Sequence, residues 1–574
     1  DSKYNLFLRS SNYIWQNRYG MRIIPFLSIA YLFSMVCCSP SQQPTRRDVI
    51  GSQKLIDLYF SKSEIDTMLT YLQNNRKGYD SMRKYKLPNE VGPVLRFDPR
   101  PDHFQLHKRG TKQEFTQSSV ELPQADYQIA FLTVTELAEL VKTKRISSTQ
   151  LTKIYLGRLK KYGDTLKTVV TITEELALQQ ALKADKEISE GNYKGMLHGI
   201  PYGIKDLFSV PGYKTTWGAE PYQQQIIDQK AEVVQILEEA GAVLVAKLTT
   251  GALARGDVWF GGKTKNPWDL KQGANGSSAG SASATAAGLV PFAIGTETLG
   301  SILAPAARCG VTGLRPTFGS ISRDGCMTLS WSMDKVGVIA RSAQDCALIF
   351  SHIKGTHGKE MMDRSTIDYD FAFTPRTNLN GLKIGYFKKL FDNDTTVKHK
   401  IDSLSLYTLR TLGTELEEIQ MPDSIPFDIF DIILRAEAGS FFDELVRAHQ
   451  DRLMSEQDGD SRANSLRQAR FISAVEYLQA NRFRKLLIEK FNLIIKKFDL
   501  VIAPANGKNI SLAGNLSGHP AITIPHGFDD KGRPTAITFI GNLYDEAPLL
   551  EAAFLFQQNT EWEERHPKLF YRNE

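Results

Sequence analysis

A run of small residues at positions 273–301 constrains this chain more than any other feature. It reads GANGSSAGSASATAAGLVPFAIGTETLGS, and its serines Ser277 and Ser301 each stand beside a glycine. Small residues let a second backbone or a substrate approach N–H groups closely. Upstream, Lys205 follows the mostly apolar run Ile200–Ile204. The combination of serines, glycines and a lysine indicates acyl chemistry with a serine nucleophile and an oxyanion pocket.

The serine needs a base, and the sequence favours a lysine over a histidine. The chain has ten histidines, but no G-x-S-x-G elbow surrounds either serine. His198 and His519 are therefore expected to be structural or pocket-lining. Burial can bring a lysine pKa from about 10.4 to roughly 7–8, where the amine can accept a proton. Lys205 suits this role, although a lysine beside Asp206 is also typical of a surface ion pair.

Composition narrows the class of protein. The chain has 574 residues with 42% hydrophobic and 23% charged residues and a net charge of +6, which is ordinary for a globular protein and gives little support to nucleic-acid binding. The five cysteines form no CxxC pair and no zinc-ligand spacing. We expect Cys309, Cys326 and Cys346 to be buried as small apolar residues.

The N-terminal region is typical of an export signal. Met21 and Arg22 precede an apolar run, Ile23–Val36, which is too short to span a membrane, and the cysteines Cys37 and Cys38 follow it. We expect residues 1–20 to be a non-native or disordered leader and residues 21–38 to be an export segment. The paired cysteines resemble a bacterial lipoprotein processing site, so a lipid anchor at Cys37 or Cys38 would give a periplasmic or membrane-anchored protein. Plain secretion and a retained anchor or no export remain alternatives.

The rest of the chain divides into an N-terminal part and a larger body. Residues 39–128 are expected to form a helical and extended wrap, with a capping box at Ser61 and Glu64. Residues 129–570 are expected to form one domain. There, capping boxes predict helices after Thr133 and Ser147, and residues 360–490 are expected to form a mostly helical peripheral lobe. Strand-like apolar runs alternate with helices, which favours an α/β fold with one main sheet. These runs are Val243–Ala246, Val290–Ile294, Leu500–Ala503 and Ala521–Ile524.

Four segments in order carry a family resemblance. They are Leu197–Asp206, Asn266–Gly325, Trp331–Ala347 and Asn515–Gly527. With them, the chain resembles the amidase signature family over about residues 130–565. The resemblance implies a mixed β-sheet core covered by α-helices on both sides, and an amidohydrolase acting on linear amides through an acyl-enzyme.

The resemblance also assigns the catalytic residues. It implies a Ser-cisSer-Lys triad in which Ser301 is the nucleophile, Ser277 is the bridging serine on a cis peptide, and Lys205 is the base. Ser278 would support the triad by hydrogen bonding. The oxyanion hole would be formed by the backbone N–H groups of Thr298, Leu299, Gly300 and Ser301. The resemblance implies neither a metal ion nor a cofactor.

The sequence departs from the commonest family pattern near the nucleophile. Leu299 replaces a frequent glycine, Glu297 a frequent aspartate, Leu303 a frequent arginine and Ala279 a glycine. All three triad residues are kept, so we expect activity. The apolar bulk of Leu299 and Leu303 is expected to reshape the pocket for the acyl group.

Three functions follow from these observations. The first is an exported amidase that acts on a small-molecule amide and binds no nucleic acid. The second is the glutamine-hydrolysing A subunit of a tRNA amidotransferase, which the export signal contradicts. The third is an inactive, ligand-binding surface lipoprotein on the same scaffold, which the intact triad disfavours.

Overall fold

In a computed structural model of the chain, the described residues are 43–56, 58–82, 84–85, 95–108, 110–116, 120–355, 365–392, 397–422, 425–505 and 507–572. The expected leader and export segment, with Cys37 and Cys38, lie outside them. The chain divides into two compact units, Asp1–Lys86 and Leu87–Glu574. Within the described ranges, no helix has both the length and the apolar character needed to cross a membrane.

The described residues of the first unit form two helices, α1 (Arg46–Ile56) and α2 (Lys62–Met82). The capping box predicted at the start of α2 is confirmed. The Ser61 amide donates to a Glu64 carboxylate oxygen at 2.7 Å, and the Glu64 amide donates to Ser61 Oγ at 3.4 Å. Ile65, in the first turn of α2, is buried.

The extended segment at residues 95–125 belongs to the second unit. The Glu114 amide donates to the Phe373 carbonyl at 2.8 Å, and the ring of Phe97 packs edge-on against Phe318 with 5.0 Å between centroids. The boundary between the two units at Lys86 lies within the expected wrap of residues 39–128. The described residues between 95 and 125 hydrogen-bond to and pack on the rest of the second unit.

The core of the second unit is an 11-stranded mixed sheet. In spatial order its strands are β1 (Val169–Ile172), β3 (Val243–Leu248), β2 (Pro201–Lys205), β8 (Phe292–Glu297), β10 (Lys335–Ala340), β9 (Thr312–Arg315), β14 (Ala521–Phe528), β15 (Pro534–Gly541), β13 (Leu500–Pro504), β11 (Ile384–Tyr386) and β12 (Leu416–Glu418). Strand β2 runs parallel to β3 and β8, whereas β8, β10, β9, β14, β15 and β13 pair antiparallel in that order. The four predicted strands are confirmed, with the second displaced to start at Phe292.

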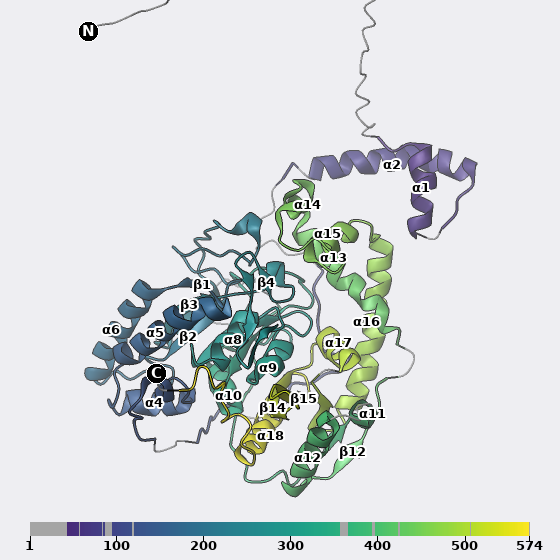
Figure 1. The fold of residues 1–574 in the computed structure, drawn as a ribbon. Helices are drawn as coiled ribbons and strands as arrows, with labels where there is room; N and C mark the ends of the chain where they lie inside the picture. Colours follow the sequence, from purple (N-terminus) through teal and green to yellow (C-terminus); the bar gives the residue numbers. More distant parts are fainter. Residues whose placement is uncertain are drawn as a thin grey trace, which may run out of the picture. The chain divides into compact units, whose positions relative to one another are not determined.

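Alternating side chains of these strands enter two separate cores. On β13, for example, Ile502 joins the core on one face and Val501 the core on the other. One face packs against α8 (Ala279–Ala286), α9 (Leu303–Cys309), α16 (Ala474–Ile495) and α17 (Lys508–Ser517), and the other against α10 (Ala343–Ile353) and α18 (Ala547–Gln558). This confirms the expected sheet with helices on both sides (Figure 1).

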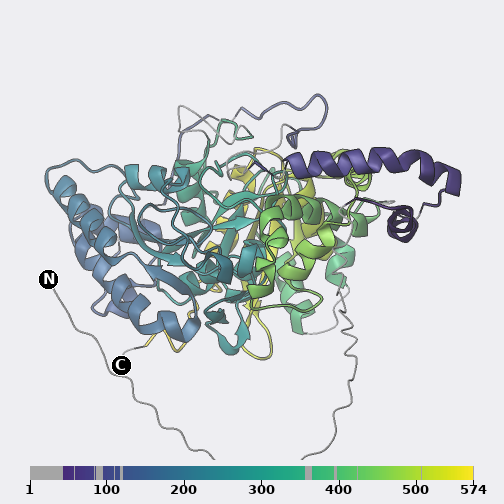
Figure 2. The same cartoon turned by 90° about the horizontal axis from the view of Figure 1, so that it is seen from above.

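Five helices accompany the β1–β3–β2 end of the sheet, which is the blue end in Figures 1 and 2. They are α3 (Asp126–Ile129), α4 (Val134–Lys142), α5 (Ser148–Leu166), α6 (Glu174–Ser189) and α7 (Glu232–Glu239). The capping boxes predicted at Thr133 and Ser147 are both formed, at the starts of α4 and α5.

The predicted peripheral lobe is mostly helical. It contains α11 (Lys388–Asp392), α12 (Val397–Thr411), α13 (Asp431–Phe441), α14 (Asp443–Arg447) and α15 (Arg462–Ala469). It also supplies β11 and β12, which extend the main sheet at its green end. Smaller elements complete the unit: the hairpins β4–β5 (Val258–Trp259, Gly262–Lys263) and β6–β7 (Lys265–Asn266, Asp269–Gly273), and 3-10 helices at Glu220–Tyr222, Ala252–Ala254, Phe427–Phe430 and Gln450–Leu453.

Candidate active site

Lys205 ends strand β2 and is completely buried. Its amine lies 2.8 Å from Ser277 Oγ and 3.0 Å from Ser278 Oγ. It also lies 2.8 Å from Thr296 Oγ1, a partner that the sequence did not reveal. Burial lowers the pKa of Lys205 to about 7. A large fraction of Lys205 is therefore neutral near pH 7, as a base must be.

The neighbouring Asp206 pairs with a different lysine. Its carboxylate lies 2.8 Å from Lys247 Nζ on the adjacent strand β3, and both side chains are completely buried. The Thr216 amide donates to the same carboxylate at 2.9 Å. Consecutive residues at the end of a strand point in opposite directions, so Lys205 and Asp206 serve separate clusters. The surface ion pair considered for these two residues is wrong.

The two neighbouring serines lie between β7 and α8, and the peptide bond from Gly276 to Ser277 is cis. A Cβ atom on Gly276 would meet the Gly256 carbonyl oxygen at 1.8 Å, so only glycine fits at this position. Ser278 Oγ donates to the Thr296 carbonyl at 3.0 Å, and the Thr296 amide lies 3.2 Å from the same hydroxyl. Ser278 thus ties the serine pair to strand β8, as a supporting residue would.

Ser301 lies in the turn between β8 and α9, and its side chain is nearly buried. The Ser278 amide donates to the Ser301 carbonyl at 3.0 Å, which fixes the turn against the serine pair. Among the hydrogen bonds of the described chain, none joins the hydroxyls of Ser277 and Ser301. The structure therefore brings Lys205, Ser277 and Ser278 into direct contact and places the backbone of Ser301 beside them.

The turn around Ser301 carries unused hydrogen-bond donors. Gly300 has a φ of +79°, a conformation that glycine adopts without strain. Glu297 accepts the amides of Ile302 and Leu303 at 2.8 Å and 3.0 Å. Within the part of the chain that the structure describes, the N–H groups of residues 299–301 have no acceptor. Three consecutive free N–H groups form a suitable site for a negatively charged oxygen.

The buried carboxylate of Glu297 holds this turn in place. Arg315 donates to its carboxylate at 2.8 Å and Asn515 at 2.9 Å, and all three side chains are buried. Burial acts to raise the pKa of Glu297, but the charge of Arg315 and the turn's N–H groups outweigh it and lower the pKa to about 2. The turn is therefore fixed by a buried charged group.

A second carboxylate holds the start of the same turn. Thr298 Oγ1 donates to Asp334 at 2.6 Å, and Asp334 also accepts the amides of Leu329 and Ser330 at 2.7 Å and 2.9 Å. Thr298 and Asp334 line a cavity of about 20 Å³ together with Ala254. The sequence carries no signal for Asp334, because its partner Thr298 lies 36 positions away, just after strand β8.

Among the residues that the structure describes, no histidine hydrogen-bonds to Lys205, Ser277 or Ser301. His198 contacts Glu187 at 3.0 Å, and His519 contacts Ser517 at 2.8 Å, so both are structural. One histidine lies between a serine and an aspartate elsewhere in the chain: His526 Nδ1 is 3.1 Å from Ser405 Oγ, and His526 Nε2 is 3.5 Å from Asp402 Oδ1. All three side chains are buried away from solvent.

The three cysteines of the body belong to its hydrophobic cores. Cys309, Cys326 and Cys346 are buried free thiols, as expected. Across the described residues, no group of three or more His, Cys, Asp or Glu side chains is arranged to hold a metal ion.

Comparisons with known proteins show the family to which the chain belongs. The family model "Amidase" matches residues 150–514, which include Lys205, Ser277 and Ser301. The chain is 33% identical over 493 residues to the A subunit of the glutamyl-tRNA(Gln) amidotransferase of Coxiella burnetii, with 76% of this chain and 99% of the relative covered. The same-named protein of Carboxydothermus hydrogenoformans is 33% identical over 491 residues, with 77% of this chain and 100% of the relative covered.

A solved structure shows the same fold. The native peptide amidase of Stenotrophomonas maltophilia superposes with a TM-score of 0.67 at 28% identity, covering 76% of this chain and 98% of its own. From the family match, the relatives and this shared architecture, the chain belongs to the amidase signature family of amide-hydrolysing enzymes.

Proposed function

We propose that this protein hydrolyses a linear carboxamide through an acyl-enzyme on Ser301, with Ser277 as the bridging serine and Lys205 as the base. One observation carries the proposal: a completely buried lysine amine, with a pKa lowered to about 7, lies 2.8 Å from Ser277 Oγ. A neutral amine in this position can take a proton from the serine that it contacts.

The mechanism follows from the arrangement of the groups. When substrate binds, Ser301 Oγ comes within hydrogen-bond distance of Ser277 Oγ, because catalytic hydrogen bonds often tighten only in the substrate complex. Lys205 takes the Ser277 proton, Ser277 takes the Ser301 proton, and Ser301 attacks the carbonyl carbon. The N–H groups of residues 299–301 receive the oxyanion. The C–N bond then breaks as Ser277 returns a proton to the leaving amine, and Lys205 reprotonates Ser277. A water molecule, deprotonated through the same relay, then attacks the acyl-enzyme and releases the carboxylic acid from Ser301.

A covalent probe tests the nucleophile. A fluorophosphonate should label the native protein at one site, and Ser301→Ala should abolish the labelling. Lys205→Met should slow labelling by about 100-fold or more while the melting temperature stays close to that of the native protein. Absence of labelling in the native protein would instead favour the ligand-binding lipoprotein.

A second candidate is a glutamine-hydrolysing A subunit of a tRNA amidotransferase. The curated relatives favour it over a stand-alone amidase, because they bear this name and are covered over almost their whole length. The two candidates differ in substrate. Ammonia release from free glutamine that requires partner chains supports the second, whereas ammonia release from simple amides or peptide amides by the isolated chain supports the first.

We further propose that the protein is exported and carries a lipid at Cys37 or Cys38. The proposal is supported by the apolar run Ile23–Val36 that precedes the two cysteines. Mass spectrometry of the mature N-terminus in a bacterial host tests it. A lipidated cysteine supports export and is incompatible with assembly on tRNA in the cytosol, and an intact Met21–Val36 segment contradicts both processing and the lipid anchor.

A further inference from the structure

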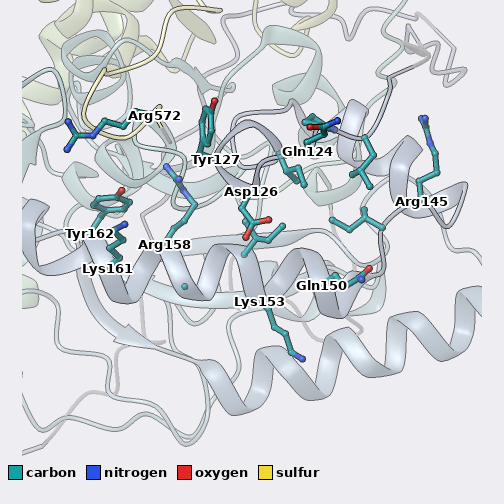
Figure 3. A pocket seen from close by; sticks show the side chains of 16 residues that line it. Gln124, Asp126, Tyr127, Arg145, Gln150, Lys153, Arg158, Lys161, Tyr162 and Arg572 are labelled. Atoms are coloured by element: carbon teal, nitrogen blue, oxygen red, sulfur yellow. The ribbon is translucent and has the colours of Figure 1, made fainter. Parts of the chain in front are cut away.

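A hollow of the second unit lies along α5, away from the serine–lysine cluster. This α5 groove has a volume of about 680 Å³. One wall is a face of α5 from Gln150 to Lys161, and the other is formed by residues 122–129 with Arg145, Ile146 and Arg572 (Figure 3). None of the residues that form the candidate active site lines it.

The groove is strongly cationic. Five cationic side chains line it, against one carboxylate, that of Asp126. The five are Arg145, Lys153, Arg158, Lys161 and Arg572. Figure 3 shows Arg145 and Arg572 toward opposite ends of the view, with Arg158 between them. The charge is therefore distributed along the groove and does not converge on a single point, as it would around one phosphate.

One of these cations is built into the fold. Arg158 is only 8% exposed. Its Nε donates to the Gly288 carbonyl at 2.8 Å, and one terminal nitrogen donates to the carbonyls of Ala287 and Phe570 at 2.8 Å and 2.9 Å. All of these acceptors are neutral. These bonds hold the guanidinium in a fixed position at the groove wall, and Asp126, the one carboxylate that lines the groove, is close enough to interact with its charge.

The glycine at the middle of α5 also points to an external occupant. Gly157 costs about 1 kcal/mol of helix stability relative to alanine. No atom lies within 4 Å of the position that its Cβ would occupy, so packing within the chain does not require glycine there. An absent side chain on an open helix face leaves room for another backbone to approach.

From the charge, the shape and this glycine, we propose that the α5 groove binds an extended acidic peptide segment of a partner protein. The face from Gln150 to Lys161 spans about 16 Å at 1.5 Å per residue, which matches about five residues of extended chain. The side-chain amide of Gln124 and the NH2 group of Gln150, whose Oε1 accepts the Ser147 amide, can pair with a peptide backbone. Buried Ile129 and Ile146 with Ile154 supply an apolar floor. This binding is independent of the proposed amide hydrolysis.

Fluorescence anisotropy of the full chain tests the proposal. The probe is a labelled hexapeptide that alternates glutamate and leucine, with a glutamine–leucine peptide as its neutral counterpart. The native protein should bind the acidic peptide at least about tenfold more tightly than the neutral one. Gly157→Trp should fill the groove and weaken binding about tenfold, and Lys153→Glu with Lys161→Glu should abolish it.

Matched variants separate groove binding from general electrostatics. Lys183→Glu with Lys186→Glu makes the same charge change on the exposed face of α6 and should leave the affinity unchanged. Fluorophosphonate labelling of Ser301 in all variants should match the native protein, which also verifies their folding. An equal loss of peptide affinity in the α6 and α5 charge variants would overturn the proposal. Native peptide affinity in Gly157→Trp would overturn it too. Displacement of the peptide by millimolar inorganic phosphate or by anionic lipid vesicles would reassign the groove to those ligands.

Discussion

At the scale of single residues, the site depends on buried charges that are neutralised by specific partners. Glu297 shows this most clearly, since Arg315 and two turn amides surround its carboxylate. Removing one partner of a buried ion pair costs about 3–5 kcal/mol, because the other charge is left unpaired in the interior. The same carboxylate orders the turn that presents residues 299–301, so its loss affects stability and catalysis together.

We predict that Glu297→Gln lowers the free energy of unfolding by about 3 kcal/mol or more and slows labelling of Ser301. Glu174→Gln, which breaks the exposed pair with Lys160, is the matched control and should cost less than about 1 kcal/mol. Urea unfolding measures both. Because the pKa of Glu297 is lowered to about 2, its contribution is complete above the unfolded pKa of about 4.3 and is lost as the pH falls toward 2. Equal unfolding free energies for the two variants would contradict this account of the turn.

At the scale of elements, the peripheral lobe contacts a turn beside the candidate active site through Arg462 at the start of α15. Its guanidinium donates to the carbonyls of Leu253 and Ala254 at 3.1 Å and 3.3 Å. Both residues have positive φ, and the same turn places the Gly256 carbonyl against Gly276, next to Ser277. Arg462 therefore fixes the turn on which the serine pair rests.

We predict that Arg462→Met slows acylation of Ser301 about tenfold at temperatures well below its melting point, because two buried carbonyls lose their donor and the turn shifts. Arg341→Met is the control: this buried arginine also donates to carbonyls, those of Leu132 and Thr285, away from the serines. It should lose similar stability while labelling proceeds at the native rate. Native labelling in Arg462→Met would mean that the turn keeps its position without the lobe.

Local patterns predicted the elements, but not the contacts between distant ones. The capping boxes at Thr133 and Ser147 and the four apolar strands are short-range signals, and all are confirmed. The motif resemblance placed Lys205 and Ser277, which the structure joins directly. Thr296, Asp334 and Arg462 were missed because each acts across a strand pairing or from another lobe, where sequence spacing carries no signal.

At the scale of the whole molecule, the second unit contains the sheet, both of its cores and every residue of the candidate site. The sequence pattern predicts one main sheet but carries no signal that β11 and β12 extend it, because that pairing is long-range. Which strands of a sheet pair, and whether they run parallel or antiparallel, depends on the complete fold.

We predict that a chain starting at Leu87 folds and is labelled by a fluorophosphonate at the native rate, since the core of the second unit is complete without α1 and α2. Circular dichroism and labelling kinetics measure this. A chain that fails to fold, or that is labelled much more slowly, would show that the first unit contributes to the stability or to the site.

The pH dependence of acylation tests the central claim most directly. Only the neutral amine of Lys205 can accept a proton, so the rate of Ser301 labelling should rise with pH, with a midpoint near the pKa of about 7, and level off above it. In Lys205→Met this rise should be absent and the remaining rate low. A native rate that stays constant from about pH 5 to 9, or a Lys205→Met variant with the native profile, would contradict a lysine base acting through Ser277.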